Sequence, residues 1–161
     1  RSIGVLLLLL PSNSAWADSR PSVSDVYFEI EGFRLWLGQS RDAVIGHFDG
    51  PGEIKCVDRD GLTYCRESFH DGTQISYYAH EELVTYIMVS NPNVRTVIDV
   101  SIGSRISDVE ERLERLYVYP HSALYQVPVR SEDAVGPHEI GVILLLENGT
   151  VTQMALSYLA Q

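Results

Sequence analysis

Apolar and polar residues alternate with a period of two over many short stretches of the chain, a pattern typical of half-buried β-strands. Asp60-Gly61, Asp71-Gly72 and Asn148-Gly149 lie between such stretches, as hairpin turns do. The alternation predicts strands over residues 26–37 (interrupted at Gly32), 54–58, 62–70, 73–79, 83–89, 96–102, 139–146 and 150–159. Residues 117–137 show no clear period and are expected to be irregular.

Two short segments have helical signals instead. Ser40 precedes apolar residues at helical spacing, and Asp42 lies in the first turn, where the helix dipole favours an acid. The run 49–52 (Asp-Gly-Pro-Gly) ends this first helix. In the second segment, Ser107 and Glu110 have the spacing of a capping box.

The two helical segments belong to stretches that resemble each other. Residues 37–40 lead into Val44 and Phe48, and residues 102–105 lead into Val109 and Leu113. The strands after each segment also correspond, and self-similarity of this kind indicates a repeated unit. We expect an α+β fold of two tandem repeats at 25–90 and 96–161, joined by a linker at 91–95. Each is a helix plus an antiparallel β-meander, and the helices pack on one face of a shared sheet within one domain.

The first residues have the features of a secretory signal peptide. A short apolar run is followed by Ala15-Trp16-Ala17, which fits a cleavage site. The apolar run is shorter than the roughly 20 residues of a membrane span. We therefore expect a signal peptide at 1–17, a flexible leader at 18–24, and an exported protein, periplasmic or extracellular, with no membrane span.

The charge balance limits the class of partner. The formal net charge is −10, and a strongly acidic protein is a poor ligand for nucleic acid or for an anionic membrane surface. The acidic balance instead favours solubility and a basic partner.

Two cysteines occur, and an even count in an exported protein favours a disulfide. If Asp60-Gly61 forms a two-residue turn, Cys56 faces Cys65 at a non-hydrogen-bonded position, close enough for a disulfide. The alternative is a metal site that also uses His70 and His80. The sequence has no C-x-x-C element, so we expect no metal and no cofactor.

The order of hydrophobic–Gly–x–Ser, a short helix, Gly-Pro and a β-meander resembles the fold of β-lactamase inhibitor proteins and of the SmpA/OmlA outer-membrane assembly lipoproteins. The tandem form looks more like the inhibitor. The resemblance covers residues 30–159, and a resemblance of fold alone does not fix the partner. It is carried in the first copy by Gly38, Ser40, Val44, Gly50, Pro51, Val84 and Ile87, and in the second by Gly103, Val109, Val151 and Met154.

A tyrosine-rich strand face is the main candidate binding surface. If the loop 80–82 closes its hairpin symmetrically, Tyr77 faces Tyr86 and Ile75 faces Met88. Comparison of the two copies points Ile87 inward, which would leave these four residues exposed as an interface, with the acidic loop of Glu81 and Glu82 at its rim. The reverse assignment, with the tyrosines in the core, stays open.

The sequence has no catalytic motif, so we expect no enzyme and no catalytic residues. The favoured function is a non-catalytic, exported protein-binding or scaffold module. One alternative is a secreted enzyme inhibitor that inserts the acidic loop of Glu81 and Glu82. Another is a small-ligand-binding or hydrolytic protein with a site near 117–138, which contains His121 and His138.

Overall fold

The structure is a computed structural model that describes residues 19–130 and 139–159. The expected signal peptide at 1–17 and His138 lie outside the described residues. Within them, no helix is long and apolar enough to cross a membrane.

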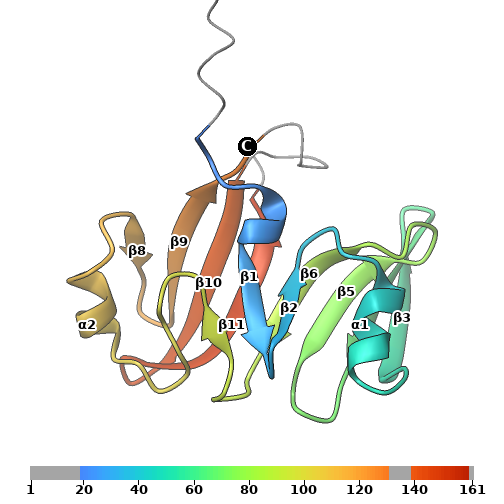
Figure 1. The fold of residues 1–161 in the computed structure, drawn as a ribbon, viewed down its shortest axis with the longest axis horizontal. Helices are drawn as coiled ribbons and strands as arrows, with labels where there is room; N and C mark the ends of the chain where they lie inside the picture. The colour runs from blue at the N-terminus through green and yellow to red at the C-terminus, as the bar shows by residue number, and fades with distance from the viewer. Residues whose placement is uncertain (1–18, 131–138, 160–161) are drawn as a thin grey trace, which may run out of the picture.

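The largest structural unit of the described chain is one antiparallel sheet of eight strands (Figure 1). Neighbouring strands are joined mainly by hairpins, because short turns with left-handed residues such as Asp60, Gly61, Asn148 and Gly149 separate the alternating stretches. The strands are, in spatial order, β3 (Glu53–Arg59), β4 (Leu62–Ser68), β5 (Gln74–Tyr78), β6 (Val84–Val89), β11 (Thr150–Tyr158), β10 (Glu139–Glu147), β9 (Ser122–Pro128) and β8 (Leu116–Val118).

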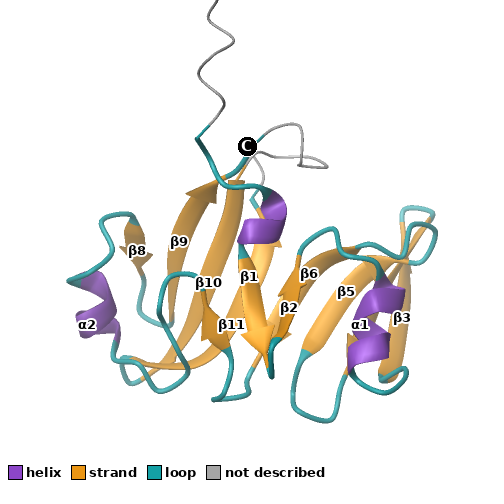
Figure 2. Cartoon of the chain, in the orientation of Figure 1, coloured by secondary structure: helices purple, strands orange, loops and turns teal. Residues whose placement is uncertain are grey.

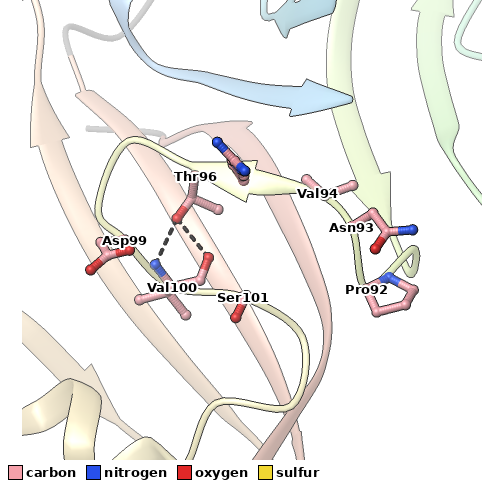
Figure 3. A pocket seen from close by; sticks show the side chains of 8 residues that line it. Pro92, Asn93, Val94, Thr96, Asp99, Val100 and Ser101 are labelled. Carbon is pink, nitrogen blue, oxygen red and sulfur yellow. Dashed lines mark hydrogen bonds between the residues drawn. The ribbon is translucent and has the colours of Figure 1, made fainter. Parts of the chain in front are cut away.

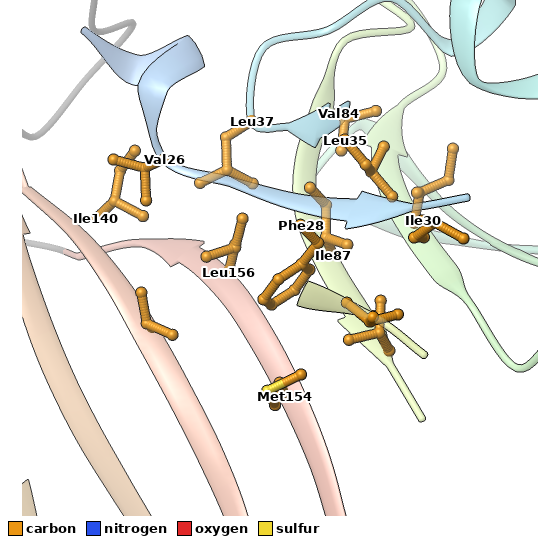
Figure 4. Packing of buried hydrophobic residues seen from close by; sticks show 14 of the residues in the cluster. Val26, Phe28, Ile30, Leu35, Leu37, Val84, Ile87, Ile140, Met154 and Leu156 are labelled. Carbon is orange, nitrogen blue, oxygen red and sulfur yellow. The ribbon is translucent and has the colours of Figure 1, made fainter. Parts of the chain in front are cut away.

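A second, smaller sheet covers the middle of the large one (Figure 1). It contains β2 (Phe33–Trp36), β1 (Tyr27–Ile30) and β7 (Arg95–Thr96), in that order. The main core lies between the two sheets, where Phe28 and Leu35 of the small sheet meet residues of β6 and β11 (Figure 4). The fully buried side chains of this core include Phe28, Leu35, Leu37, Ile75, Ile87, Ile140, Leu144, Met154 and Leu156.

The helices are short (Figure 2). They are the 3-10 turn η2 (Val23–Asp25), α1 (Arg41–His47) and α2 (Ile106–Glu110). The predicted cap of α1 is confirmed, because the Ser40 hydroxyl accepts a hydrogen bond from the Ala43 amide. The predicted capping box of α2 is wrong: the N-cap residue is Arg105, and its side chain makes no capping hydrogen bond.

The expected α+β class, with helices packed on one face of a shared sheet, is therefore wrong. The protein is mostly β, with two antiparallel sheets and two α-helices among the described residues. The reason is one of size. Eight strands about 4.8 Å apart span about 34 Å, whereas the seven residues of α1 make a helix about 10 Å long. Each helix buries one side chain, Val44 or Val109, and the small sheet covers the centre.

Two further expectations need correction. Residues 117–137 were expected to be irregular, yet β9 runs from Ser122 to Pro128 and pairs with β10 over its whole length. The strand expected at 96–102 is only the two residues Arg95 and Thr96. There the Thr96 hydroxyl donates to the Val100 carbonyl and accepts from the Val100 amide, which closes the chain into a loop.

The two halves of the large sheet share one arrangement. In each half a short helix precedes a four-stranded meander, and the last strands of the two meanders, β6 and β11, pair with each other. The same backbone hydrogen bonds join the residues before each helix to the last strand: Gly38 N to Val84 O and Val84 N to Gln39 O, against Gly103 N to Val151 O and Val151 N to Ser104 O. The repeat boundaries themselves remain a prediction.

A buried ion pair fixes α1 to the large sheet. The Glu67 side chain is fully buried, and its carboxylate accepts from the Arg41 guanidinium at 2.7 and 3.2 Å. The Gly52 amide donates to the same carboxylate at 2.8 Å, and the Tyr77 hydroxyl donates at 3.4 Å. Gly52 has to be glycine here, because a Cβ would lie 2.2 Å from the Ser68 carbonyl oxygen.

We predict that Arg41→Ala lowers the free energy of unfolding by about 3–5 kcal/mol, because it leaves the Glu67 carboxylate buried without its cation. Glu67→Gln should cost less, since Arg41 is partly exposed and also lies 3.6 Å from Glu82. Denaturant titration of both variants measures this order. As a control, Lys55→Ala breaks an exposed pair with Glu53 and should cost under about 1 kcal/mol. Equal losses for Arg41→Ala and Lys55→Ala would contradict the role of the buried pair.

The predicted disulfide and its hairpin register are confirmed. Cys56 pairs with Cys65, and Arg59 with Leu62, around the Asp60-Gly61 turn. All seven residues of β3 are exposed, so this strand buries little apolar surface. The disulfide therefore anchors β3 to the rest of the sheet.

Replacing both cysteines by alanine should lower the free energy of unfolding by about 2–3 kcal/mol, as expected for a cross-link that closes a loop of nine residues. Thermal unfolding of the oxidised protein and of the double variant measures the loss. The reduced wild-type protein is the control and should resemble the variant. An unchanged midpoint in both cases would show that β3 does not need the cross-link.

Candidate functional site

The face of the large sheet that points away from the small sheet is the candidate site, and we call it the open face. Side chains alternate between the two faces of a sheet. Ile87 and Leu156, which are paired with each other, point into the core. Tyr86 and its partner Ser157 therefore belong to the open face, as does Met88, and all three are half-buried.

The open face is hollowed over β3, β4, β5, β6 and β11. The hollow has a volume of about 780 Å³. Five strands contribute to it because they lie side by side in the sheet, although they span a long stretch of the sequence. The lining residues are Val57, Arg59, Asp60, Leu62, Tyr64, Arg66, Tyr78, Thr85, Tyr86, Ser157 and Tyr158.

Tyrosine and arginine give the hollow its chemistry. The rings of Tyr64 and Tyr78 meet edge to face, with their centroids 5.4 Å apart. Burial raises the pKa of the Tyr86 hydroxyl above its usual 10, and the positive charge of Arg66 opposes this rise. Arg59 and Arg66 outnumber Asp60 in the lining, so the hollow is basic within a chain whose formal net charge is −10.

The expected register of the β5–β6 hairpin is wrong. Tyr77 pairs with Val84 and Ser76 with Tyr86, which leaves Thr85 of β6 as the extra residue of a β-bulge. An extra residue in one strand sends the following side chains to the opposite face. Tyr77, Ile75 and Val84 therefore stay together on the core side, where they are buried. The side chains after the extra residue, Tyr86 and Met88, lie on the open face, and they are the only members of the expected tyrosine-rich face found there.

The two glutamates of the expected surface lie elsewhere. Glu81 and Glu82 are exposed in the loop between β5 and β6. Glu82 lies 3.6 Å from Arg41, next to the buried ion pair, and Glu81 lies 3.5 Å from His80. The structure does not bring them into the hollow.

Tyr86 is the only lining residue that the sequence predicted as part of the site. We consider three of the missed residues: Tyr64, Tyr78 and Arg66. A signal for two of them was present. The predicted Cys56–Cys65 pairing implies that residues 64 and 66 point to the face opposite Cys65. Cys65 is buried, so this alternation places Tyr64 and Arg66 on the open face. Tyr78 required the register of β4 against β5, in which it pairs with Tyr64.

A second hollow, of about 570 Å³, lies beside β7 (Figure 3). Its lining comes from a single short segment of the chain that includes β7, namely residues 92–96 and 99–101. Its central polar groups already bond to each other, since Thr96 and Val100 exchange the two hydrogen bonds drawn in Figure 3. These contacts close the loop, and the hollow carries no aromatic side chain. It is a weaker candidate than the open face.

No group of three or more His, Cys, Asp or Glu within residues 19–130 and 139–159 could hold a metal ion. The two cysteines are joined in the disulfide, so they are not available as thiolate ligands. In the region of the expected ligand site, Tyr117 and Tyr119 are exposed by 52% and 54% at the outer edge of the sheet, and His121 lies in the turn between β8 and β9.

No family model, curated protein or solved structure shows a significant match to this chain. The resemblance to β-lactamase inhibitor proteins and to the SmpA/OmlA lipoproteins therefore stays a prediction.

Single replacements of Tyr77 and Tyr86 by alanine should show which face of the sheet each side chain occupies. Tyr77→Ala removes a buried ring from the core and a hydrogen bond to Glu67, so it should cost about 3–5 kcal/mol of the free energy of unfolding. Tyr86→Ala removes a half-buried ring from the open face and should cost about 1 kcal/mol. Urea titration of both variants measures the difference. A larger loss for Tyr86→Ala would show that the faces are assigned the wrong way round.

Proposed function

We propose that the protein is a non-catalytic, exported binding module that holds a protein partner against the open face of its large sheet. The observation that carries the proposal is the group of half-buried tyrosines on this face, Tyr64, Tyr78 and Tyr86, around one hollow. Tyrosine is enriched at the centres of protein interfaces, because it offers a large apolar contact and a hydroxyl with little loss of side-chain entropy.

The charges of the hollow favour a partner segment that carries a carboxylate. Arg59 and Arg66 line the hollow, with Asp60 as the opposing charge. An arginine can bind a carboxylate through two parallel hydrogen bonds. We propose that a loop of the partner, with an acidic side chain beside an apolar one, enters the hollow between the arginines and the tyrosines.

The shape of the sheet suits this role. The eight strands form one continuous hydrogen-bonded sheet, and the small sheet packs against its other face. A preformed surface of this kind loses little conformational entropy when it binds. The disulfide supports export, because disulfides persist in oxidising compartments.

The resemblance to inhibitor proteins suggests a second function, inhibition of an enzyme through the loop of Glu81 and Glu82. Both side chains are about half exposed. They lie outside the hollow, so variants can test the two surfaces separately.

The test is affinity capture from envelope and culture extracts of the source organism, with wild-type protein and three double variants as bait. We expect a specific partner that the face variant, Tyr78→Ser with Tyr86→Ser, fails to capture, because it removes two rings from the hollow. The matched control is Tyr117→Ser with Tyr119→Ser, which removes two exposed tyrosines at the far edge of the sheet and should keep the partner. Circular dichroism verifies that each variant is folded.

The third variant, Glu81→Lys with Glu82→Lys, tests the inhibitor function. Loss of the partner in this variant alone would move the binding site to the loop and contradict the proposal. Capture of the same partner by the face variant, or the absence of any specific partner from both extracts, would also count against the open face.

A further inference from the structure

The outer edge of the large sheet at β3 is unpaired among the described strands. β3 pairs with β4 on one side and ends the sheet on the other. All seven of its residues are exposed, including Ile54 and Val57 with exposed fractions of 43% and 58%. A long, exposed edge strand offers a row of free amide and carbonyl groups to another strand.

The backbone geometry identifies which groups are free. The Cα atoms of Cys56 and Cys65 are 4.1 Å apart, which is the spacing of a non-hydrogen-bonded antiparallel pair. The amide and carbonyl of Cys56 therefore point away from β4, and those of Ile54 and Asp58 do the same. Because the disulfide holds β3 against β4, this edge is preformed.

The charges of the edge differ from those of the whole protein. β3 contains two acidic residues, Glu53 and Asp58, and two basic ones, Lys55 and Arg59. The edge is thus locally neutral in a chain with a formal net charge of −10. Two copies of the protein can therefore meet at this edge with less charge repulsion than their net charges alone would produce.

We propose that two copies of this chain pair antiparallel along β3, about a two-fold axis at Cys56. The amide and carbonyl groups that point away from β4 in one copy must face the same kind of groups in the other copy. This requirement restricts the two-fold axis to a few positions along β3. With the axis at Cys56, Ile54 of each copy forms a hydrogen-bonded pair with Asp58 of the other. Glu53 then faces Arg59 of the other copy, an opposite-charge cross-strand pair that forms twice in the dimer.

The neighbouring axes are unfavourable. An axis at Lys55 places the Lys55 side chains of the two copies opposite each other. An axis at Val57 places Lys55 of one copy opposite Arg59 of the other. Like charges directly opposite each other destabilise a strand pair. With the axis at Cys56, Lys55 lies opposite Val57 of the other copy. The aliphatic stem of Lys55 then covers this apolar side chain, and its ammonium group reaches water.

Pairing at this edge joins the two large sheets and extends the hollow of the open face. Val57 and Arg59 line that hollow, so the Lys55 and Glu53 side chains of the second copy would form its outer wall. The proposal does not depend on the proposed function, since the dimer is measured without a partner.

Sedimentation velocity from low micromolar to near-millimolar protein, in about 0.15 M salt to screen the net charge, should show a reversible monomer–dimer equilibrium. Arg59→Glu places Glu53 against a glutamate and should weaken the dimer about tenfold. Adding Glu53→Arg to this variant restores opposite charges and should return the dissociation constant to within about threefold of wild type. Arg115→Glu makes the same change in net charge at an exposed site on the far side of the sheet and should leave the equilibrium unchanged.

Amide hydrogen exchange locates the interface. In the dimer, the outward amides of Ile54, Cys56 and Asp58 should gain protection as the protein concentration rises. The amides of Lys55 and Val57, which already bond to β4, should not change. This alternation distinguishes strand pairing from a contact through side chains.

Three results would overturn the proposal: a monomer at every concentration, a dimer that Arg59→Glu does not weaken, or a dimer without the alternating protection. A monomer whose outward amides become protected only when an unrelated extended peptide is added would also overturn it, and would assign the edge to a different partner. In each case the affinity capture through the open face can still succeed, so failure of the dimer is distinguishable from failure of the proposed function.

Discussion

The pairing of β6 with β11 is the contact on which the rest of the structure depends. Met154 pairs with Val89 and Leu156 with Ile87, and this joins two meanders into a single sheet of eight strands. Neither meander is large enough to bury its apolar face alone, since small domains bury only a modest fraction of their surface. Once the two are joined, their central strands form a continuous apolar surface that needs a cover.

The small sheet provides that cover and connects the two halves. β1 and β2 precede the first meander, β7 precedes the second, and β1 pairs with β7. Phe28 is fully buried at this centre. At the outer end of the first half, the cover is α1, and here the contact is polar: the buried Glu67 carboxylate binds Arg41 of α1 and the Gly52 amide. The apolar centre and the ion pair together hold one face of the large sheet closed.

The opposite face has a different composition because it is left uncovered by the small sheet. Its side chains over the first half include tyrosines, arginines and Met88, which tolerate water and also make large contacts when a partner removes that water. Its edge at β3 is neutral and exposed. The fold thus separates two tasks: one face stabilises the protein, and the other face and its edge are available for association.

Local patterns in the sequence determined the β3–β4 hairpin and the cap of α1. The Asp60-Gly61 turn, the Cys56–Cys65 pair and the Ser40 cap all follow from neighbouring residues, because turn and cap preferences are local backbone effects. The burial of Tyr77 could not be predicted in this way. The bulge at Thr85 shifts β6 by one residue against β5, and alternation alone does not reveal where an extra residue is inserted. β9 could not be predicted either, because its residues show no clear alternation and the strand is defined by its pairing with β10.

The sequence by itself determined most strands, their turns and the disulfide, because these depend on residues close together in the chain. Only the tertiary structure decided which face of the sheet is closed, and hence that Tyr64, Tyr78 and Tyr86 share a hollow while Tyr77 is buried. Burial of a sheet face depends on what packs against it. Here that is a small sheet assembled from two distant segments, β1–β2 and β7, whose pairing no local pattern encodes.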